Sequence, residues 1–153
     1  MTLNHRDREF ISVGVSVAAG CKRCFEVHVK EARSQGVSEE KLAQSMNIGL
    51  NVREHAQAIM HEPGLLVLGR KLAQLVTRTG EDEEGSEAGA PSATRIEELT
   101  SVACAFAVNC ETSLEQHQAN ARLAGATDEE MQEAIRISRF IKGKADSLCC
   151  MRI

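Results

Sequence analysis

The chain has 153 residues and a formal net charge of −4, and this length suits one well-buried core rather than two large domains. It contains no Trp, no Tyr and only four Phe, so aliphatic residues and alanine supply most of its hydrophobic fraction of 42%. Because such a composition favours helices packed on helices over aromatic-rich strands, we expect one all-α domain over residues 1–153.

Charge and hydropathy exclude several classes of protein. Five acidic residues between positions 81 and 87 account for the net negative charge, and the rest of the chain shows no basic footprint for nucleic acid. No stretch approaches the length of a membrane span, and the first ten residues, MTLNHRDREF, are polar where a secretory signal is apolar. We therefore expect a cytoplasmic protein that binds neither nucleic acid nor membranes.

The chain has six cysteines, and in a cytoplasmic protein these are poor evidence for a framework of structural disulfides. A reducing cytosol keeps most thiols reduced, so paired cysteines there are redox-active or metal-binding by default. The cysteines are therefore the first place to look for chemistry.

The chain contains an internal repeat, which appears when the sequence is shifted against itself by 89 positions. The repeats begin at about residues 1 and 94, and the first extends to about residue 60 and the second to about 144. No gap is needed, and the aligned pairs include Glu9 with Glu98, Cys21 with Cys110, Cys24 with Ser113, His28 with His117, and Gly36 with Gly125. Two related copies in one chain predict packing about a pseudo-twofold axis.

Each copy is predicted to form three helices. In the first copy, apolar residues at helical spacing predict a helix over about 7–19, and a second helix begins at Cys21 or Lys22 and ends at Gly36. Ser38 then caps a third helix.

The connection between the copies, about 61–93, should hold a helix and a mobile acidic linker. Residues 64–77 carry leucines and valines at helical spacing, and residues 80–93 are acidic, small and rich in helix breakers. In the second copy, Thr127 and Glu130 form a capping-box pattern that opens a helix running to about Lys144.

The residues Cys21, Cys24 and His28 carry the candidate chemistry. On a helix that begins near Cys21 they share one stripe, because they are spaced by three and then four residues. The two sulfurs can then meet in a disulfide. The helix N-terminus, with Lys22 and Arg23, favours thiolate over thiol, and His28 can accept a thiol proton and later return it.

Glu9 is the candidate partner of His28. It lies about three helical turns before Gly20, and a sharp reversal at Gly20 would send the second helix back along the first. A carboxylate at that place would orient the imidazole and raise its basicity, which completes an arrangement of nucleophile, base and orienting group.

The pattern of Glu9, Cys21, Cys24 and His28 resembles the alkylhydroperoxidase D and carboxymuconolactone decarboxylase superfamily. The resemblance covers Glu9 to about Asn51 and again, degenerately, Glu98 to about Lys142. It implies an AhpD-like helical bundle and a cysteine pair that reduces hydroperoxides and cycles through a disulfide. It also implies a dithiol or lipoyl-type electron donor and a homo-oligomer, either a trimer or a hexamer. We expect no cofactor and no metal.

The chain departs from the family's peroxidases in two respects. They carry His immediately before the second Cys, where this chain has Arg23, and they place the complete motif in the later repeat. Here the second copy has Ser113 in place of a thiol, so Cys110 and His117 cannot run a local dithiol cycle. Together with Glu98 they form a degenerate second site, which we interpret as scaffold. The lactone decarboxylases of the superfamily lack the cysteine pair.

Other interpretations of these residues are open. Cys21 and Cys24 could form half of a zinc site completed by His28 and Glu9, and the whole chain could be a non-catalytic helical binding or assembly module. Cys104 has apolar neighbours and is predicted to be a small buried hydrophobe. Cys149 and Cys150 are either an incidental exposed pair or a shuttle that passes electrons to the dithiol.

Overall fold

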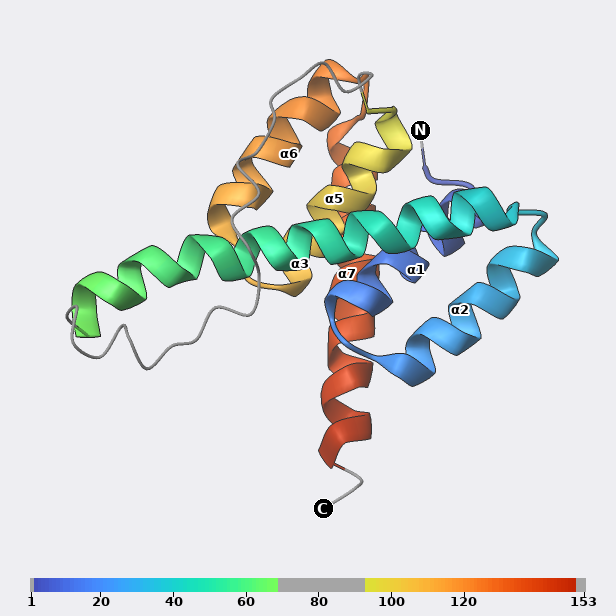
Figure 1. Cartoon of the computed structure of the whole chain (residues 1–153). Helices are drawn as coiled ribbons and strands as arrows, with labels where there is room; N and C mark the ends of the chain where they lie inside the picture. The colour runs from blue at the N-terminus through green and yellow to red at the C-terminus, as the bar shows by residue number, and fades with distance from the viewer. Residues whose placement is uncertain (1, 69–92, 151–153) are drawn as a thin grey trace.

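The computed structural model describes residues 2–68 and 93–150, and in these ranges it contains six helices and no strand. The all-α prediction is confirmed. None of the helices in the described part of the chain is long and apolar enough to cross a membrane. The helices, labelled in Figure 1, are α1 (His5–Ala18), α2 (Lys22–Ser34), α3 (Glu39–Leu68), α5 (Arg95–Ala107), α6 (Glu111–Leu123) and α7 (Asp128–Cys150).

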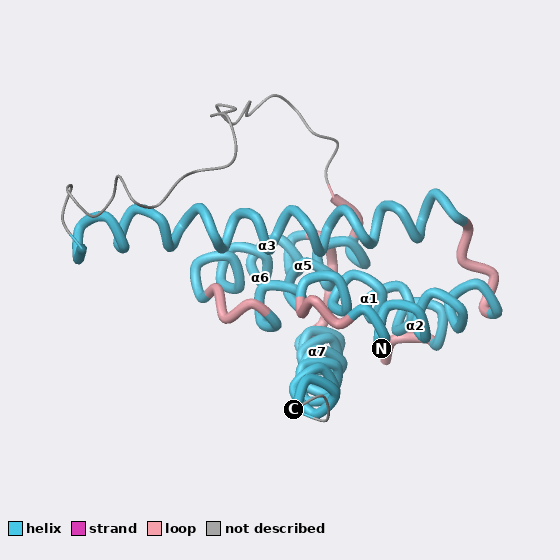
Figure 2. Tube along the Cα trace, turned by 60° about the horizontal axis from the view of Figure 1, so that its bottom comes forward, coloured by secondary structure: helices cyan, strands magenta, loops and turns pink. Residues whose placement is uncertain are grey.

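The third helix of each repeat packs against both repeats. At the centre α1 lies against α5, and each also packs on the second and third helices of its own repeat. In addition α3 packs on α5 and α7 packs on α1, so each third helix covers the first helix of both repeats. Figure 2 shows α3 and α7 on opposite sides of a layer that holds α1, α2, α5 and α6. This reciprocal packing confirms the predicted pseudo-twofold relation.

The first helix of each repeat is central because it is buried nearly all round. In α1 every residue from Glu9 to Ser16 is buried, and in α5 every residue from Glu98 to Ala105. The second helices are outer ones, since α2 buries only Cys24 and Ala32, and α6 only Ser113 and Ala121. The polar residues buried on α1 and α5 therefore include the two glutamates of the repeat motif.

Side-chain caps fix where several helices begin. Asn4 accepts a hydrogen bond from the backbone N–H of Asp7 at 2.8 Å and caps α1. The capping box predicted for α7 is confirmed, because the N–H of Thr127 donates to Glu130 at 3.0 Å and the N–H of Glu130 donates to the Thr127 hydroxyl at 3.2 Å. The equivalent cap of α3 is Ser38, whose hydroxyl accepts from the N–H of Lys41.

Both third helices are longer than the sequence predicts. Helix α3 continues without a break to Leu68, through the start of the segment expected to form a separate connecting helix, and α7 runs to Cys150 rather than to about Lys144. The end of α7 has no Pro, and its one Gly, Gly143, is tolerated inside the helix. The predicted mobile linker, and the part of the connecting helix beyond Leu68, lie outside the described residues.

The close approach of α1 and α3 depends on two glycines that face each other. A Cβ atom built on Gly49 would lie 2.3 Å from the carbonyl oxygen of Gly14, and one built on Gly14 would lie 2.9 Å from the carbonyl oxygen of Ser45. Backbone atoms cannot swing aside as a flexible side chain can. Side chains at these two positions would therefore push the helices apart.

We predict that Gly49→Ala lowers the free energy of unfolding by at least about 2 kcal/mol, because the new methyl group overlaps the backbone of α1. Urea denaturation monitored by circular dichroism measures the change. The matched control is Gly143→Ala on α7, where an added Cβ meets no atom within 4 Å. That substitution should stabilise the protein by about 0.5–1 kcal/mol through helix propensity alone. Equal effects of the two substitutions would contradict the packing argument.

Candidate active site

The site is built by the turn between α1 and α2. Gly20 has a positive φ of 69°, and the N–H of Cys21 donates to the carbonyl of Ser16 at 2.9 Å, which closes the turn. Cys21 is the N-cap residue of α2, and its sulfur accepts a hydrogen bond from the backbone N–H of Cys24 at 3.2 Å. Both cysteines therefore stand at the N-terminal end of a 13-residue helix, where the helix dipole favours a thiolate.

Cys21 and Cys24 form a disulfide, with Cα atoms 5.3 Å apart. They are 7% and 8% exposed, so the bond lies just beneath the surface. The side chain of Lys22 is 90% exposed and reaches Glu26 at 3.9 Å, and Arg23 is exposed as well. The expectation that these two cations favour the thiolate is therefore weakened, because their charges are screened by solvent.

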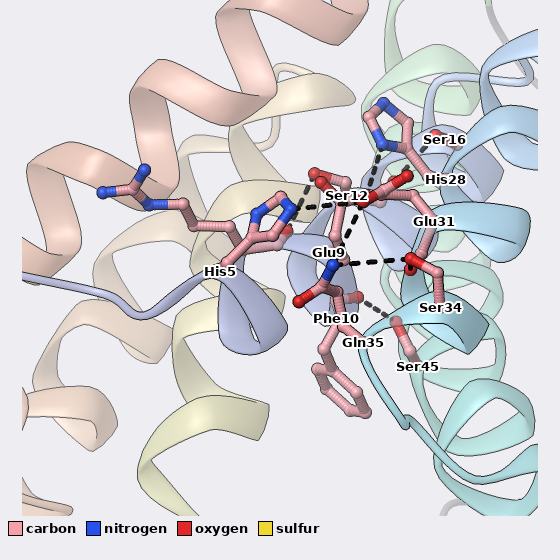
Figure 3. Close-up of polar contacts among 11 residues, drawn as sticks. His5, Glu9, Phe10, Ser12, Ser16, His28, Glu31, Ser34, Gln35 and Ser45 are labelled. Carbon is pink, nitrogen blue, oxygen red and sulfur yellow. Dashed lines mark hydrogen bonds and ion pairs between the residues drawn. The ribbon is translucent and has the colours of Figure 1, made fainter.

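His28 lies one turn beyond Cys24 and is held by Glu9. The imidazole Nδ1 and a carboxylate oxygen of Glu9 are 2.9 Å apart, and the two side chains are only 19% and 11% exposed. Figure 3 shows the carboxylate of Glu9 directed at His28, beside Ser12. When Nδ1–H donates to Glu9, Nε2 is left as the basic nitrogen of the ring. The contact is the one that a reversal at Gly20 predicts.

The second repeat reproduces this arrangement without a second thiol. His117 Nδ1 lies 2.8 Å from the carboxylate of Glu98, and the thiol of Cys110 donates to the Ser113 hydroxyl at 3.1 Å. Asn109 has a φ of 56° at the position equivalent to Gly20. The two sites thus share the turn, the His–Glu pair and the first cysteine, and they differ in whether a disulfide can form.

Pockets lie beside both sites and are related by the pseudo-twofold axis. The pocket next to Glu9, between α1 and α7, has a volume of about 400 Å³, and the pocket next to His117 has about 330 Å³. Sequence reasoning missed the contribution of α7 to the first site. The packing of α7 on α1 of the other repeat cannot be seen in the sequence of either repeat alone. The residues of α7 in that pocket are Glu133, Arg136, Ile137, Phe140 and Ile141.

The remaining cysteines are separate from the dithiol. Cys104 is fully buried, as predicted, and burial raises the pKa of its thiol. Cys149 is exposed near the end of α7, and neither interpretation of the Cys149 and Cys150 pair is tested by this position. Residues 2–60 and 93–149, whose side chains the structure describes, hold no group of three His, Cys, Asp or Glu side chains arranged for a metal ion. The zinc interpretation gains no support from this arrangement.

Comparison with known families tests the resemblance. Residues 2–53 match the model of the carboxymuconolactone decarboxylase family. The similarity to this family covers 52 of the 153 residues. The match spans α1, α2 and the first half of α3, which includes Glu9, Cys21, Cys24 and His28. Searches of curated proteins and of solved structures give no significant match. The segment that is similar to the family is thus the repeat that carries the complete motif.

The second repeat offers a test of the geometry. In a Cys21→Ser, Cys24→Ser background, we predict that Ser113→Cys forms a disulfide with Cys110, because the sulfur of Cys110 already lies 3.1 Å from the Ser113 oxygen. Peptide mapping by mass spectrometry after mild oxidation detects the bond. Failure of this pair to link, under conditions that fully link Cys21 and Cys24 in the unmodified chain, would show that the two sites are not equivalent.

Proposed function

We propose that the protein is a thiol-dependent peroxidase or a closely related disulfide oxidoreductase that cycles through the Cys21–Cys24 disulfide. The observation that carries the proposal is the disulfide at the N-terminus of α2, one turn from a histidine whose Nδ1 contacts a buried carboxylate. Disulfide chemistry at such a place has a thiolate stabilised by the helix and a nearby group that moves protons.

The proposed cycle begins with the reduced dithiol. His28 Nε2 accepts the proton of one thiol, and the thiolate attacks the O–O bond of a hydroperoxide ROOH to give a sulfenic acid and, with the returned proton, the alcohol ROH. The second thiol then displaces water from the sulfenic acid and closes the disulfide. An external dithiol donor, itself oxidised to a disulfide, returns the pair to the reduced state by thiol–disulfide exchange.

Glu9 supports this cycle as a positioning residue. Its carboxylate receives the Nδ1–H of His28 and keeps Nε2 available as the proton acceptor. Arg23, exposed at the position where the family's peroxidases carry a histidine, cannot carry protons at neutral pH. The proton transfers of the proposed cycle therefore depend on His28 alone.

We predict that one equivalent of cumene hydroperoxide removes two free thiols per reduced chain, and that these map to Cys21 and Cys24. Thiol titration before and after the addition, followed by peptide mapping, measures the change. An unchanged thiol count, with no disulfide exchange towards dithiol donors, would favour the non-catalytic module. One tightly held zinc per purified chain would favour the metal site instead.

The repeat supplies the matched control for the proton relay. We predict that Glu9→Gln slows oxidation of the dithiol by about tenfold to a hundredfold, because the carboxylate no longer orients the imidazole. Glu98→Gln changes the same contact in the second site and should leave the rate within about twofold. Both substitutions disturb a buried hydrogen bond and should cost about 1–3 kcal/mol of stability. Equal slowing by the two variants would show that Glu9 acts only through the fold.

We further propose that the chain forms a homo-oligomer. Several large apolar side chains are exposed on the outer helices, namely Val27, Met46, Leu50, Met60, Leu123 and Phe140. Light scattering at micromolar concentration should give a trimer or hexamer of the 16.7 kDa chain. A mass equal to one chain would contradict the proposal.

A further inference from the structure

The pocket beside Glu9 has a mixed polar and apolar lining. Helix α1 contributes His5, Arg8, Glu9 and Ser12, and α7 contributes Glu133, Arg136, Ile137, Phe140 and Ile141. Its volume of about 400 Å³ lies in the range of small-molecule sites. Glu9 is both a wall of this pocket and the partner of His28, so the pocket lies directly beside the proton relay.

The pocket next to His117 is the pseudo-symmetric equivalent of the pocket beside Glu9. It is lined by Ser113 and His117, which are the equivalents of Cys24 and His28. The two pockets share further positions under the 89-residue shift, and these are Ser12 with Ser101, Ile137 with Ile48, Phe140 with Asn51, and Ile141 with Val52. Cys24 and His28 do not line the pocket beside Glu9, and Glu9 is the residue that joins this pocket to the His–Glu pair.

The two pockets differ in their charges. Arg8, Arg136 and His5 line the first pocket, and the positions related to them by the 89-residue shift hold Glu97, Asn47 and Thr94. Phe140 is likewise replaced by Asn51. Because the second repeat packs its helices in the same way without these side chains, the fold does not require them. The residues that line the second pocket include His55 and His117 but no Arg and no Phe, so the two arginines and the phenylalanine ring belong to the pocket beside Glu9.

Most charges in the first pocket already have partners. Arg8 pairs with Glu133 at 2.7 Å, His5 contacts Glu31 at 3.3 Å, and Glu9 holds His28. Glu133 also accepts the backbone N–H of Leu3 at 3.0 Å. Among the side chains of residues 2–60 and 93–149, Arg136 has no ion-pair partner, and it stands one turn before Phe140, which is 61% exposed.

We propose that this pocket selects hydroperoxides that carry a carboxylate, with the anion on Arg136 and the apolar body on Ile137, Phe140 and Ile141. The inference rests on the proposed function and names its substrate class. A guanidinium binds a carboxylate through two parallel hydrogen bonds, and the neighbouring carboxylates already have partners, since Glu133 pairs with Arg8 and Glu9 accepts a hydrogen bond from His28. Since Arg136 is exposed, solvent weakens its attraction for the anion. We therefore expect a carboxylate to react only about threefold to tenfold faster than an uncharged analogue.

The kinetic test uses a pre-reduced protein and a single turnover, so that no electron donor is needed. The probes are cumene hydroperoxide bearing a para carboxylate and the methyl ester of the same compound. We expect the carboxylate to oxidise the dithiol faster than the ester, and Arg136→Gln to slow only the carboxylate, by about threefold to tenfold. Raising the salt concentration to about 0.5 M should narrow the difference.

The matched control is Arg139→Gln. Arg139 lies on the same helix, but its guanidinium stands 5.6 Å from the centre of the Phe106 ring and it does not line the pocket. This substitution removes the same charge from α7 and should leave the ratio of the two rates unchanged. If both variants slow the reaction of the carboxylate equally, α7 attracts the anion through its overall charge. The assignment to Arg136 would then be overturned.

A binding measurement separates the pocket from the chemistry. Calorimetry with the oxidised protein and the alcohol product that carries the para carboxylate should give a Kd that Arg136→Gln weakens and Arg139→Gln does not. If no hydroperoxide oxidises the dithiol and this binding persists, the proposed function fails and the pocket assignment stands. If carboxylate and ester react equally fast and the alcohol binds without regard to Arg136, the pocket assignment is overturned and the peroxidase proposal stands.

Discussion

A single residue with positive φ, Gly20, reverses the chain between α1 and α2, and the geometry of the site depends on that reversal. The turn makes Cys21 the N-cap of α2 and lays the following helix back along α1, so that His28 meets Glu9 across 19 residues of sequence. A side chain at Gly20 would be strained by the left-handed backbone and would approach the guanidinium of Arg53. The second repeat makes the same turn with Asn109, and Asn is among the residues that tolerate this conformation best.

The His–Glu pair has a structural role as well as a proposed chemical one. A carboxylate buried on a central helix needs a hydrogen-bond donor, and in both repeats the donor is a histidine from the second helix. The pair at Glu98 and His117 shows that this link is retained where no disulfide can form. What sets the first site apart is therefore the second sulfur, at Cys24, and the charged pocket that α7 completes.

Much of this arrangement follows from local patterns in the sequence. Spacing predicts three helices per repeat, the Thr127 capping box, and the approach of Glu9 to His28, because each depends on residues within one repeat. The contribution of Arg136 and Phe140 was not predictable in the same way, because it depends on α7 packing against the first helix of the other repeat. The extensions of α3 and α7 were missed because Pro63 and Gly64 lie near the predicted end of α3 and Gly143 lies near that of α7, yet both helices continue through these residues. The catalytic roles of Cys21, Cys24, His28 and Glu9 stay predictions.

The structure separates two groups that could favour a thiolate at Cys21, namely the neighbouring cations and the backbone N–H groups at the start of α2. Lys22 and Arg23 are adjacent to the cysteines in sequence, but they point into solvent, where water and salt screen their charge. The backbone N–H of Cys24 instead donates directly to the sulfur of Cys21, in a nearly buried position where a hydrogen bond to charge is strong. That donor belongs to the first turn of α2 and needs no rearrangement of the helix to serve a thiolate. Once the disulfide is reduced, we therefore expect the helix end, rather than the neighbouring cations, to be the main source of thiolate stabilisation at Cys21.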